Sequence, residues 1–191
     1  KFDSDLKSDK PKQEIKLIDF SSTTSIFDKE CASYPAQYAS TNGTPLKKWD
    51  EVTSNLSDLD TSKLHYVKLP ENHIVIDFDI KNEEGEKSFE INLKEASKWP
   101  PTYAELSKSG GGIHLHYIYT GDVSKVSRVY DNNIEIKVFT GNSSLRRRLS
   151  RCNNLPIATI SSGIPLKGED KVINFEGFKN EQALRTMIKK N

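Results

Sequence analysis

The sequence His73-Ile-Val-Ile-Asp-Phe-Asp-Ile80 combines a run of β-branched residues with two carboxylates. The apolar run is typical of a buried central strand. Residues two apart in a strand point to the same face, so Asp77 and Asp79 project together, with Cβ atoms roughly 7 Å apart. Buried like charges repel and are costly to desolvate, and a divalent cation is the usual remedy. The alternative is an edge strand with two solvated aspartates, which fits poorly with so apolar a run.

Length and composition set the class of protein. The chain has 191 residues, enough for one domain with a real core. It carries 28 Lys+Arg against 27 Asp+Glu, so net charge says little about partners. No run of 18 or more apolar residues predicts a transmembrane helix, and no signal peptide is visible. Because the sequence begins with Lys1 rather than Met, we expect a fragment of a longer protein, with a flexible lead-in over residues 1–14.

Cysteine usage points to a reducing compartment. The two cysteines, Cys31 and Cys152, do not have the spacing of metal ligands. So few cysteines favour a cytoplasmic protein with free thiols, although a disulfide between them stays open as an alternative.

Two later strands carry polar side chains that suit the same chemistry. Residues 113–119 alternate, so His114 and His116 are expected on one face. The next predicted strand carries Glu135 and Lys137 on the face opposite its apolar residues. If the three strands are neighbours, three carboxylates and a histidine converge. Carboxylate oxygens suit Mg²⁺ or Mn²⁺, and two such ions can clamp the attacking and leaving oxygens of a phosphoryl transfer.

A glycine-rich loop precedes the histidine strand. In Ser107-Lys-Ser-Gly-Gly-Gly112, backbone N–H groups are predicted to face a triphosphate, and Lys108 adds positive charge. The alternative is a flexible hairpin turn. The pattern GxxxxGK[ST] is absent from the chain, so this is not a Walker A loop. Before this loop, Thr102 and Glu105 have the spacing of a capping box and predict a short helix.

Basic residues concentrate in one segment. Four of the six arginines fall within six residues, and a short helix over Leu145–Arg151 is predicted. On that helix Arg147 and Arg151 align at i, i+4 and present a row of guanidinium groups, which suits phosphates of template or nucleotide. The alternative is a solvated surface helix. The basic residues predicted to contact nucleic acid or phosphate are Arg146, Arg147, Arg148, Arg151, Lys47 and Lys48.

Three motifs in order resemble those of archaeo-eukaryotic-type primases. Val75-Ile-Asp-Phe-Asp-Ile80 is similar to their hhhDhD motif, and Ser109-Gly-Gly-Gly-Ile-His-Leu115 to their second motif, a small-residue loop ending in His on a strand. Ile134-Glu-Ile-Lys137 resembles their third motif, a strand with one acidic residue. Order and spacing resemble the primase-polymerase branch of phages and plasmids, as does the basic-aromatic element Pro45–Trp49. The resemblance covers roughly residues 43–165.

The resemblance implies a fold and an activity. The fold would be of the α/β (α+β) class, with an RRM-like, mainly antiparallel palm sheet, flanking helices and a small N-terminal α/β subdomain, in one catalytic domain over residues 1–191. The activity would be that of a DNA primase and polymerase, a nucleotidyltransferase that makes and extends primers by a two-metal mechanism. Its partners would be a single-stranded DNA template, a primer, NTP or dNTP, and a C-terminal helicase domain, in the cytoplasm of a bacterial host cell.

The resemblance also implies site residues. Asp77, Asp79 and Glu135 would bind two Mg²⁺ or Mn²⁺ ions, and His114 would contact the phosphates of the incoming nucleotide. Two positions depart from the family pattern: Gly112 stands where many members carry Ser, and Glu135 where they carry Asp. The predicted nucleotide-binding residues are Lys108, Ser109, Gly110, Gly111, Gly112, His114 and Lys137.

Two other functions fit parts of the sequence. His114-Leu-His116 resembles the metal-binding motif of rolling-circle HUH endonucleases, which need a nucleophilic tyrosine on a downstream helix. Tyr130 is the nearest downstream tyrosine and lies in turn-like sequence. The third hypothesis is a non-catalytic module that binds single strands through aromatic residues and the arginine row. The paired aspartates would repel phosphate there unless a metal ion were present.

Overall fold

The computed structural model describes residues 14–168, 173–174 and 185–186, so nearly all of the expected lead-in lies outside the described residues. These residues form a mixed α+β structure with mostly antiparallel sheets and few helices, as the sequence predicts. None of their helices has the length and apolar character needed to cross a membrane. The elements are α1 (Ile26–Glu30), β1 (Ala36–Tyr38), η1 (Trp49–Glu51), η2 (Leu56–Asp58), β2 (His65–Val67), β3 (His73–Phe78), α2 (Phe89–Ala96), β4 (Ala104–Leu106), β5 (Ile113–Tyr119), η3 (Val123–Lys125), β6 (Val129–Asp131), β7 (Ile134–Val138), β8 (Leu145–Arg147), β9 (Ala158–Ile160), β10 (Ile173–Asn174) and β11 (Arg185–Thr186).

Strand β3 is the centre of the main sheet. The strand order is β4-β5-β3-β7-β6, and β9 pairs with β5 in parallel. All six residues of β3 are buried, and both of its neighbours are antiparallel to it. The predicted buried central strand is therefore confirmed.

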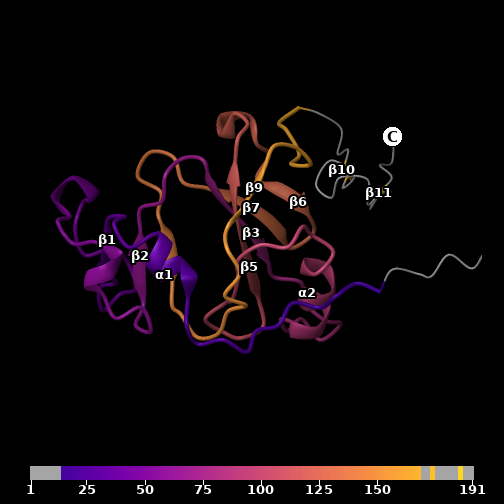
Figure 1. Cartoon of the computed structure of the whole chain (residues 1–191), viewed down its shortest axis with the longest axis horizontal. Coiled ribbons are helices and arrows are strands. Elements are labelled where there is room, and N and C mark those ends of the chain that lie inside the picture. The colour runs from indigo at the N-terminus through magenta and orange to yellow at the C-terminus, as the bar shows by residue number, and fades with distance from the viewer. Residues whose placement is uncertain (1–13, 169–172, 175–184, 187–191) are drawn as a thin grey trace, which may run out of the picture.

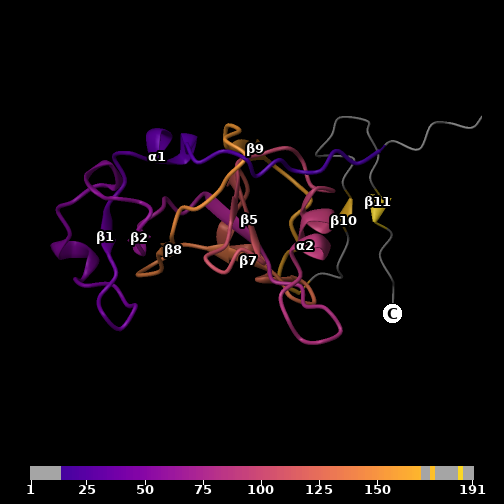
Figure 2. The ribbon, with the colours of Figure 1, turned by 90° about the horizontal axis from the view of Figure 1, so that it is seen from below.

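Alternate side chains of β3 enter two separate cores. Ile74, Ile76 and Phe78 pack with Trp99 and residues of α2 on one face. Val75 points to the other face, where the core includes Phe27 of α1. Figures 1 and 2 show α2 on one side of the central sheet, and α1 with β1 and β2 on the other.

A second sheet covers part of the Val75 face. It has the order β1-β2-β8 and is antiparallel throughout. Its inward residues, among them Ala36, Val67 and Leu145, belong to the same core as Val75. One end of the central sheet, around Asp77, lines cavities instead of entering this core.

The predicted basic helix over 145–151 is wrong, because its first residues form strand β8. Arg147 lies opposite His65 of β2, and the pairing continues to Leu145. Strand alternation buries Leu145 and Arg147 and exposes Arg146. The predicted alignment of Arg147 with Arg151 therefore does not occur.

The short helix predicted from Thr102 and Glu105 is also wrong. Residues 104–106 form β4, which pairs with β5. The Thr102 hydroxyl donates to the carbonyl oxygen of His116 instead of capping a helix. Capping-box spacing alone did not outweigh pairing with a neighbouring strand.

Two histidines form a buried pair on the Val75 face. Nε2 of His73 lies 2.9 Å from Nδ1 of His116, and both residues are fully buried. The ring of Phe27 packs against both imidazoles. Their remaining ring nitrogens are buried without hydrogen-bond partners, so burial disfavours a positive charge on the pair.

We expect this histidine pair to make the fold sensitive to acid. Burial lowers the pKa of His73 to about 4 and that of His116 well below its usual value, whereas an unfolded histidine titrates near about 6.5. Between these pH values the unfolded chain binds more protons, so the free energy of unfolding decreases as the pH falls. Urea unfolding at about pH 7 and about pH 5 measures the loss. The variant His116→Leu should lose less stability over this interval than the wild type, and an equal loss would contradict the expectation.

Candidate active site

Four acidic or imidazole side chains form a row across the central sheet. Glu105 of β4 lies opposite His114 of β5, His114 opposite Asp77 of β3, and Asp77 opposite Glu135 of β7. Directly opposed residues of antiparallel strands present their side chains on the same face. The predicted placement of Asp77, His114 and Glu135 is therefore confirmed, and the row gains Glu105.

Asp77 is the most enclosed of the predicted metal-binding carboxylates. Its Oδ1 lies 3.0 Å from Nε2 of His114 and its Oδ2 lies 3.1 Å from Nζ of Lys137. Burial acts to raise the pKa of Asp77, but the hydrogen bond and charge of His114, and then those of Lys137, lower it to about 2. Asp77 is therefore an ionised carboxylate between the imidazole of His114 and the amino group of Lys137.

Asp79 follows the end of β3 and faces a different cation. Its backbone N–H donates to the carbonyl oxygen of Asn133 (2.8 Å), and its Oδ1 lies 3.0 Å from Nζ of Lys87. Oδ1 of Asp77 and Oδ1 of Asp79 are both buried and accept no hydrogen bond of regular geometry, although the imidazole of His114 lies 3.0 Å from the first and the ammonium of Lys87 lies 3.0 Å from the second. Such oxygens have capacity left for a cation.

Gly112 makes room for the Asp79 carboxylate. A Cβ atom on Gly112 would lie 2.8 Å from Oδ1 of Asp79, 2.9 Å from Oγ of Ser107 and 3.1 Å from the carbonyl oxygen of Phe78. Glycine at position 112 therefore has a steric reason in this chain.

The N–H groups of the three glycines donate hydrogen bonds within the loop, whereas the sequence predicts that they face a triphosphate. Gly110 N–H donates to the carbonyl oxygen of Ser107 (2.9 Å), and Gly112 N–H to the Ser107 hydroxyl (2.9 Å). Gly111 N–H donates to the hydroxyl of Ser109 at 3.4 Å. The turn at Gly110, whose φ is 77°, closes the loop on itself. The N–H groups of the three glycines are therefore already engaged within the loop.

Two cavities adjoin the aspartates and share them as a common wall. The first has a volume of about 420 Å³ and opens toward β4, β5 and β8. The second, of about 370 Å³, extends toward β6 and β7 and includes Glu135 and Arg128. Among the described residues, the lining of the second cavity has one basic residue, Arg128, whereas that of the first has six: Lys87, Lys108, Lys137, Arg146, Arg147 and Arg148.

Comparison with models of known protein families gives no match to this chain, and comparison with curated proteins gives none either. The chemistry of the site is therefore argued from its residues and geometry.

The site fits a divalent cation through its carboxylates, but the carboxylates already have other partners. Within the described part of the chain, no group of three or more His, Cys, Asp or Glu side chains is arranged to hold a metal ion. His114 and Lys137 approach Asp77, and Lys87 approaches Asp79. Because two buried carboxylate oxygens accept no hydrogen bond of regular geometry, the donor set suits Mg²⁺ or Mn²⁺ once these nitrogen groups move away.

Arg147 is a structural residue, contrary to its predicted contact with nucleic acid. Its guanidinium is buried, with NH2 2.7 Å from Oε1 of Glu105 and NH1 2.7 Å from Oδ1 of Asp28. The same group stacks over the ring of Phe27, 4.4 Å from its centroid. Burial acts to raise the pKa of Glu105, but the charge of Arg147 outweighs it and the pKa is lowered.

The remaining predicted basic residues divide into two sets. Arg146 and Arg148 are exposed and line the cavity of about 420 Å³. Arg151 donates instead to the carbonyl oxygen of Ser21 (3.1 Å) and lines neither cavity beside the aspartates. Lys47 and Lys48 are exposed and also line neither cavity; the structure does not bring them to the site.

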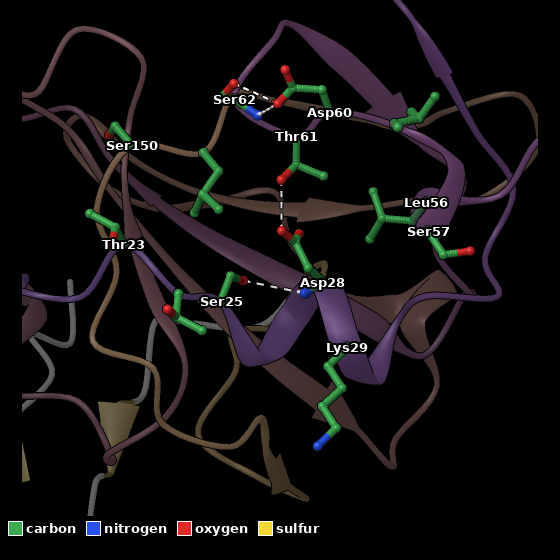
Figure 3. A pocket seen from close by; sticks show the side chains of 13 residues that line it. Thr23, Ser25, Asp28, Lys29, Leu56, Ser57, Asp60, Thr61, Ser62 and Ser150 are labelled. Carbon is green, nitrogen blue, oxygen red and sulfur yellow. Dashed lines mark hydrogen bonds between the residues drawn. The ribbon is translucent and has the colours of Figure 1, made fainter.

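A larger cavity, of about 650 Å³, lies away from the aspartates (Figure 3). Hydroxyl groups dominate its lining, and Thr61 donates to Oδ2 of Asp28 (2.6 Å). The other oxygen of Asp28 pairs with Arg147. This cavity brings together no pair of acid, base or nucleophile comparable to the row on the central sheet, so size alone does not identify the site.

Three residues of the site were missed by sequence reasoning. The capping-box spacing predicts a helix at Glu105, and no apolar alternation in Tyr103-Ala-Glu-Leu106 indicates the strand that forms there. Lys87 lies in a polar stretch that carries no motif. Asn92 is fully buried and donates to the carbonyl oxygens of Ile80 (3.2 Å) and Gly111 (2.8 Å), which joins the end of the β3 segment to the glycine loop.

Proposed function

We propose that this chain is the catalytic domain of a DNA primase-polymerase, which makes and extends primers on single-stranded DNA in phage or plasmid replication. The observation that carries the proposal is the row of Glu105, His114, Asp77 and Glu135, with Asp79 beside it and a basic cavity at one side. We further propose that the central sheet is an RRM-like palm and that the elements around β1 and β2 form a small N-terminal subdomain.

Asp77, Asp79 and Glu135 would hold two Mg²⁺ or Mn²⁺ ions. When bound, such ions acidify a primer 3′-hydroxyl and offset the charge of a triphosphate. Asp77 supports this role because its lowered pKa keeps it ionised at neutral pH. Glu135 is exposed beside it, so its longer side chain is free to turn toward the same point.

The basic cavity suits an incoming nucleoside triphosphate. In the proposed reaction the primer 3′-oxygen attacks the α-phosphorus, a new P–O bond forms, the bond to the β-phosphate oxygen breaks, and pyrophosphate leaves. His114 and Lys137 lie beside Asp77 and would donate hydrogen bonds to the phosphates. Lys108, Arg146 and Arg148 line the cavity further out and add positive charge for the triphosphate or the template.

A rolling-circle HUH endonuclease is disfavoured by two residues. His116 is fully buried and bonded to His73, so it does not join His114 as a second metal ligand. Tyr130, the nearest downstream tyrosine, is 6% exposed and its ring lies 4.8 Å from that of Trp99 in the core. A nucleophile needs access to the DNA backbone, which this position does not give.

A non-catalytic binding module is disfavoured because the aromatic residues that would stack on bases are not exposed. Tyr117, Tyr119 and Phe139 are all buried. Bases stack on exposed aromatic faces in modules of this kind. The strand aromatics therefore serve the core.

One experiment separates the three functions. The protein is incubated with primed single-stranded DNA, labelled nucleotides and Mn²⁺, and the products are analysed after denaturation. Primer extension supports the proposal, and a covalent protein–DNA adduct would support the nuclease. DNA binding that is unaffected by EDTA, with neither product, would support the binding module.

Gly112→Ala is expected to lower primer extension about a hundredfold, since misplacing a catalytic group by about 1 Å has effects of that size. The new Cβ would displace the Asp79 carboxylate or Ser107. Gly112 is not among the glycines with positive φ, so the effect is steric rather than a backbone effect. Initial rates of extension measure it.

Gly85→Asn is the matched control. A Cβ on Gly85 meets nothing within 4 Å, and its φ of 80° is one that Asn tolerates. Wild-type rates in Gly112→Ala would show that Asp79 does not need its present position.

A further inference from the structure

Lys87 is the closest cation to Asp79, and no motif marks it. Its Nζ lies 3.0 Å from Oδ1 of Asp79, and its side chain is 40% exposed to the cavity and solvent. Lys87 lines the basic cavity, as do Lys108 and Lys137. The Asp79 carboxylate, which would bind a cation, is therefore already neutralised by Lys87. A lysine side chain has a flexible four-carbon stem and a hydrated ammonium group, so it can change partners.

The backbone of Lys87 is held firmly, although its side chain is long. A Cβ on Gly111 would lie 2.9 Å from Cβ of Lys87 and 3.2 Å from its carbonyl oxygen, so glycine permits this contact. Asn92, fully buried, donates to Gly111 and also pairs with both backbone groups of Ile80. A bridge between Lys81 and Lys87 completes the hairpin that follows β3. These contacts fix Lys87 between Asp79 and the glycine loop.

The charges around Asp79 determine which group Lys87 would pair with after a cation and a triphosphate bind. Two carboxylates, Asp77 and Asp79, face three nitrogen groups, on Lys87, His114 and Lys137. A divalent cation and Lys87 compete for the same oxygen of Asp79, because both need its negative charge. A triphosphate in the adjoining cavity offers the displaced ammonium new oxygen acceptors within reach of its flexible stem.

We propose that Lys87 is an exchangeable counter-ion: it neutralises Asp79 in the metal-free protein and moves to the triphosphate of the nucleotide when the site is loaded. This inference rests on the proposed function. It assigns Lys87 two opposite effects, since the same side chain weakens cation binding and strengthens nucleotide binding. A residue with only a structural role would change both affinities in the same direction or neither.

The test measures two affinities on the full chain without any catalysis. Binding of Mn²⁺ alone is followed by electron paramagnetic resonance of the free ion. Lys87→Ala is expected to tighten it roughly two- to fivefold, which is the size of an exposed ion pair. Binding of a non-hydrolysable α,β-imido nucleoside triphosphate at saturating Mn²⁺ should weaken about tenfold in the same variant, because a charged phosphate contact is lost.

Two further variants are the controls for side-chain identity. Lys87→Arg keeps the charge and should retain most of the affinity for the triphosphate analogue. Lys94→Ala removes an exposed lysine of α2 that lines neither cavity beside the aspartates, and both of its affinities should equal those of the wild type.

The outcomes separate this inference from the proposed function. If Asp79→Asn weakens Mn²⁺ binding but Lys87→Ala leaves either affinity unchanged, or weakens both, the exchange is overturned and the cation site stands. If Asp79→Asn leaves Mn²⁺ binding unchanged, the carboxylates do not hold the cation, and the proposed function fails together with the exchange.

Discussion

Replacing Asp77 by Asn is expected to reduce template-directed nucleotide incorporation by at least about a thousandfold, equivalent to about 4 kcal/mol of transition-state stabilisation. Asp77 lies in the middle of the row, opposite His114 on one side and Glu135 on the other. Asn has the same shape but lacks the charge that a divalent cation requires. Primer extension with the variant and the wild type at equal concentration measures the effect.

The fold of this variant should survive with reduced stability. Contacts with His114 and Lys137 lower the pKa of Asp77 to about 2, against about 3.9 in an unfolded chain. A depressed pKa stabilises the fold above the unfolded value, and this contribution is lost as the pH falls toward about 2. At neutral pH the expected loss in Asp77→Asn is therefore about 2–3 kcal/mol.

Thermal unfolding gives the temperature range in which Asp77→Asn and the wild type are both folded. Primer extension by the two proteins is compared within that range. Asp50→Asn, at an exposed position in η1, is the control and should extend primers as the wild type does. If folded Asp77→Asn incorporates nucleotide at an appreciable rate, Asp77 does not hold the catalytic cation.

Arg147→Met is expected to cost about 3–5 kcal/mol of stability, because removing one partner leaves buried charges uncompensated. Glu105 is 2% exposed and pairs with Arg147 at 2.7 Å, and Asp28 pairs with it at the same distance. The lost packing of the guanidinium over Phe27 adds to the effect. Urea unfolding of the variant and the wild type gives the difference.

A double-mutant cycle shows whether the pair itself is responsible. Arg147→Met combined with Glu105→Leu should lose less stability than the sum of the single variants, because Glu105 is then no longer left as an unpaired buried charge, although Asp28 still loses its partner. Arg148→Gln changes an exposed neighbour whose Nε donates to the carbonyl oxygen of Ser62 (3.2 Å), and this variant should retain wild-type stability. Its DNA binding should weaken in a salt-dependent way. If Arg147→Met keeps wild-type stability but binds DNA more weakly, Arg147 contacts nucleic acid, as the sequence predicts.

The sequence was sufficient to predict the central strand and three of the four residues of the row, but not Glu105. Alternation in β3 and β5 determines which side chains share a face, and the structure places Asp77, His114 and Glu135 accordingly. Apolar runs and period-two patterns are local properties, so they can be read without knowing the neighbours. Which strands would be neighbours was an assumption that the pattern alone could not establish.

The surroundings of the row depend on contacts between distant segments. A run of arginines has no apolar alternation, so nothing local distinguishes β8 from a basic helix. The burial of Arg147 is decided by Glu105, 42 residues away, and by Asp28 of α1. The ion pair of Lys87 with Asp79 likewise depends on a hairpin that only the folded chain closes.

The most direct test of nucleotidyl transfer is primer extension by the unmodified chain on a primed single-stranded DNA template. Labelled nucleotides are supplied with Mg²⁺, with Mn²⁺, or with EDTA, and products are resolved by length. If Asp77, Asp79 and Glu135 hold catalytic cations, template-complementary extension is expected with one or both metal ions and none with EDTA. Absence of extension with either ion, or extension that persists in EDTA, would contradict it.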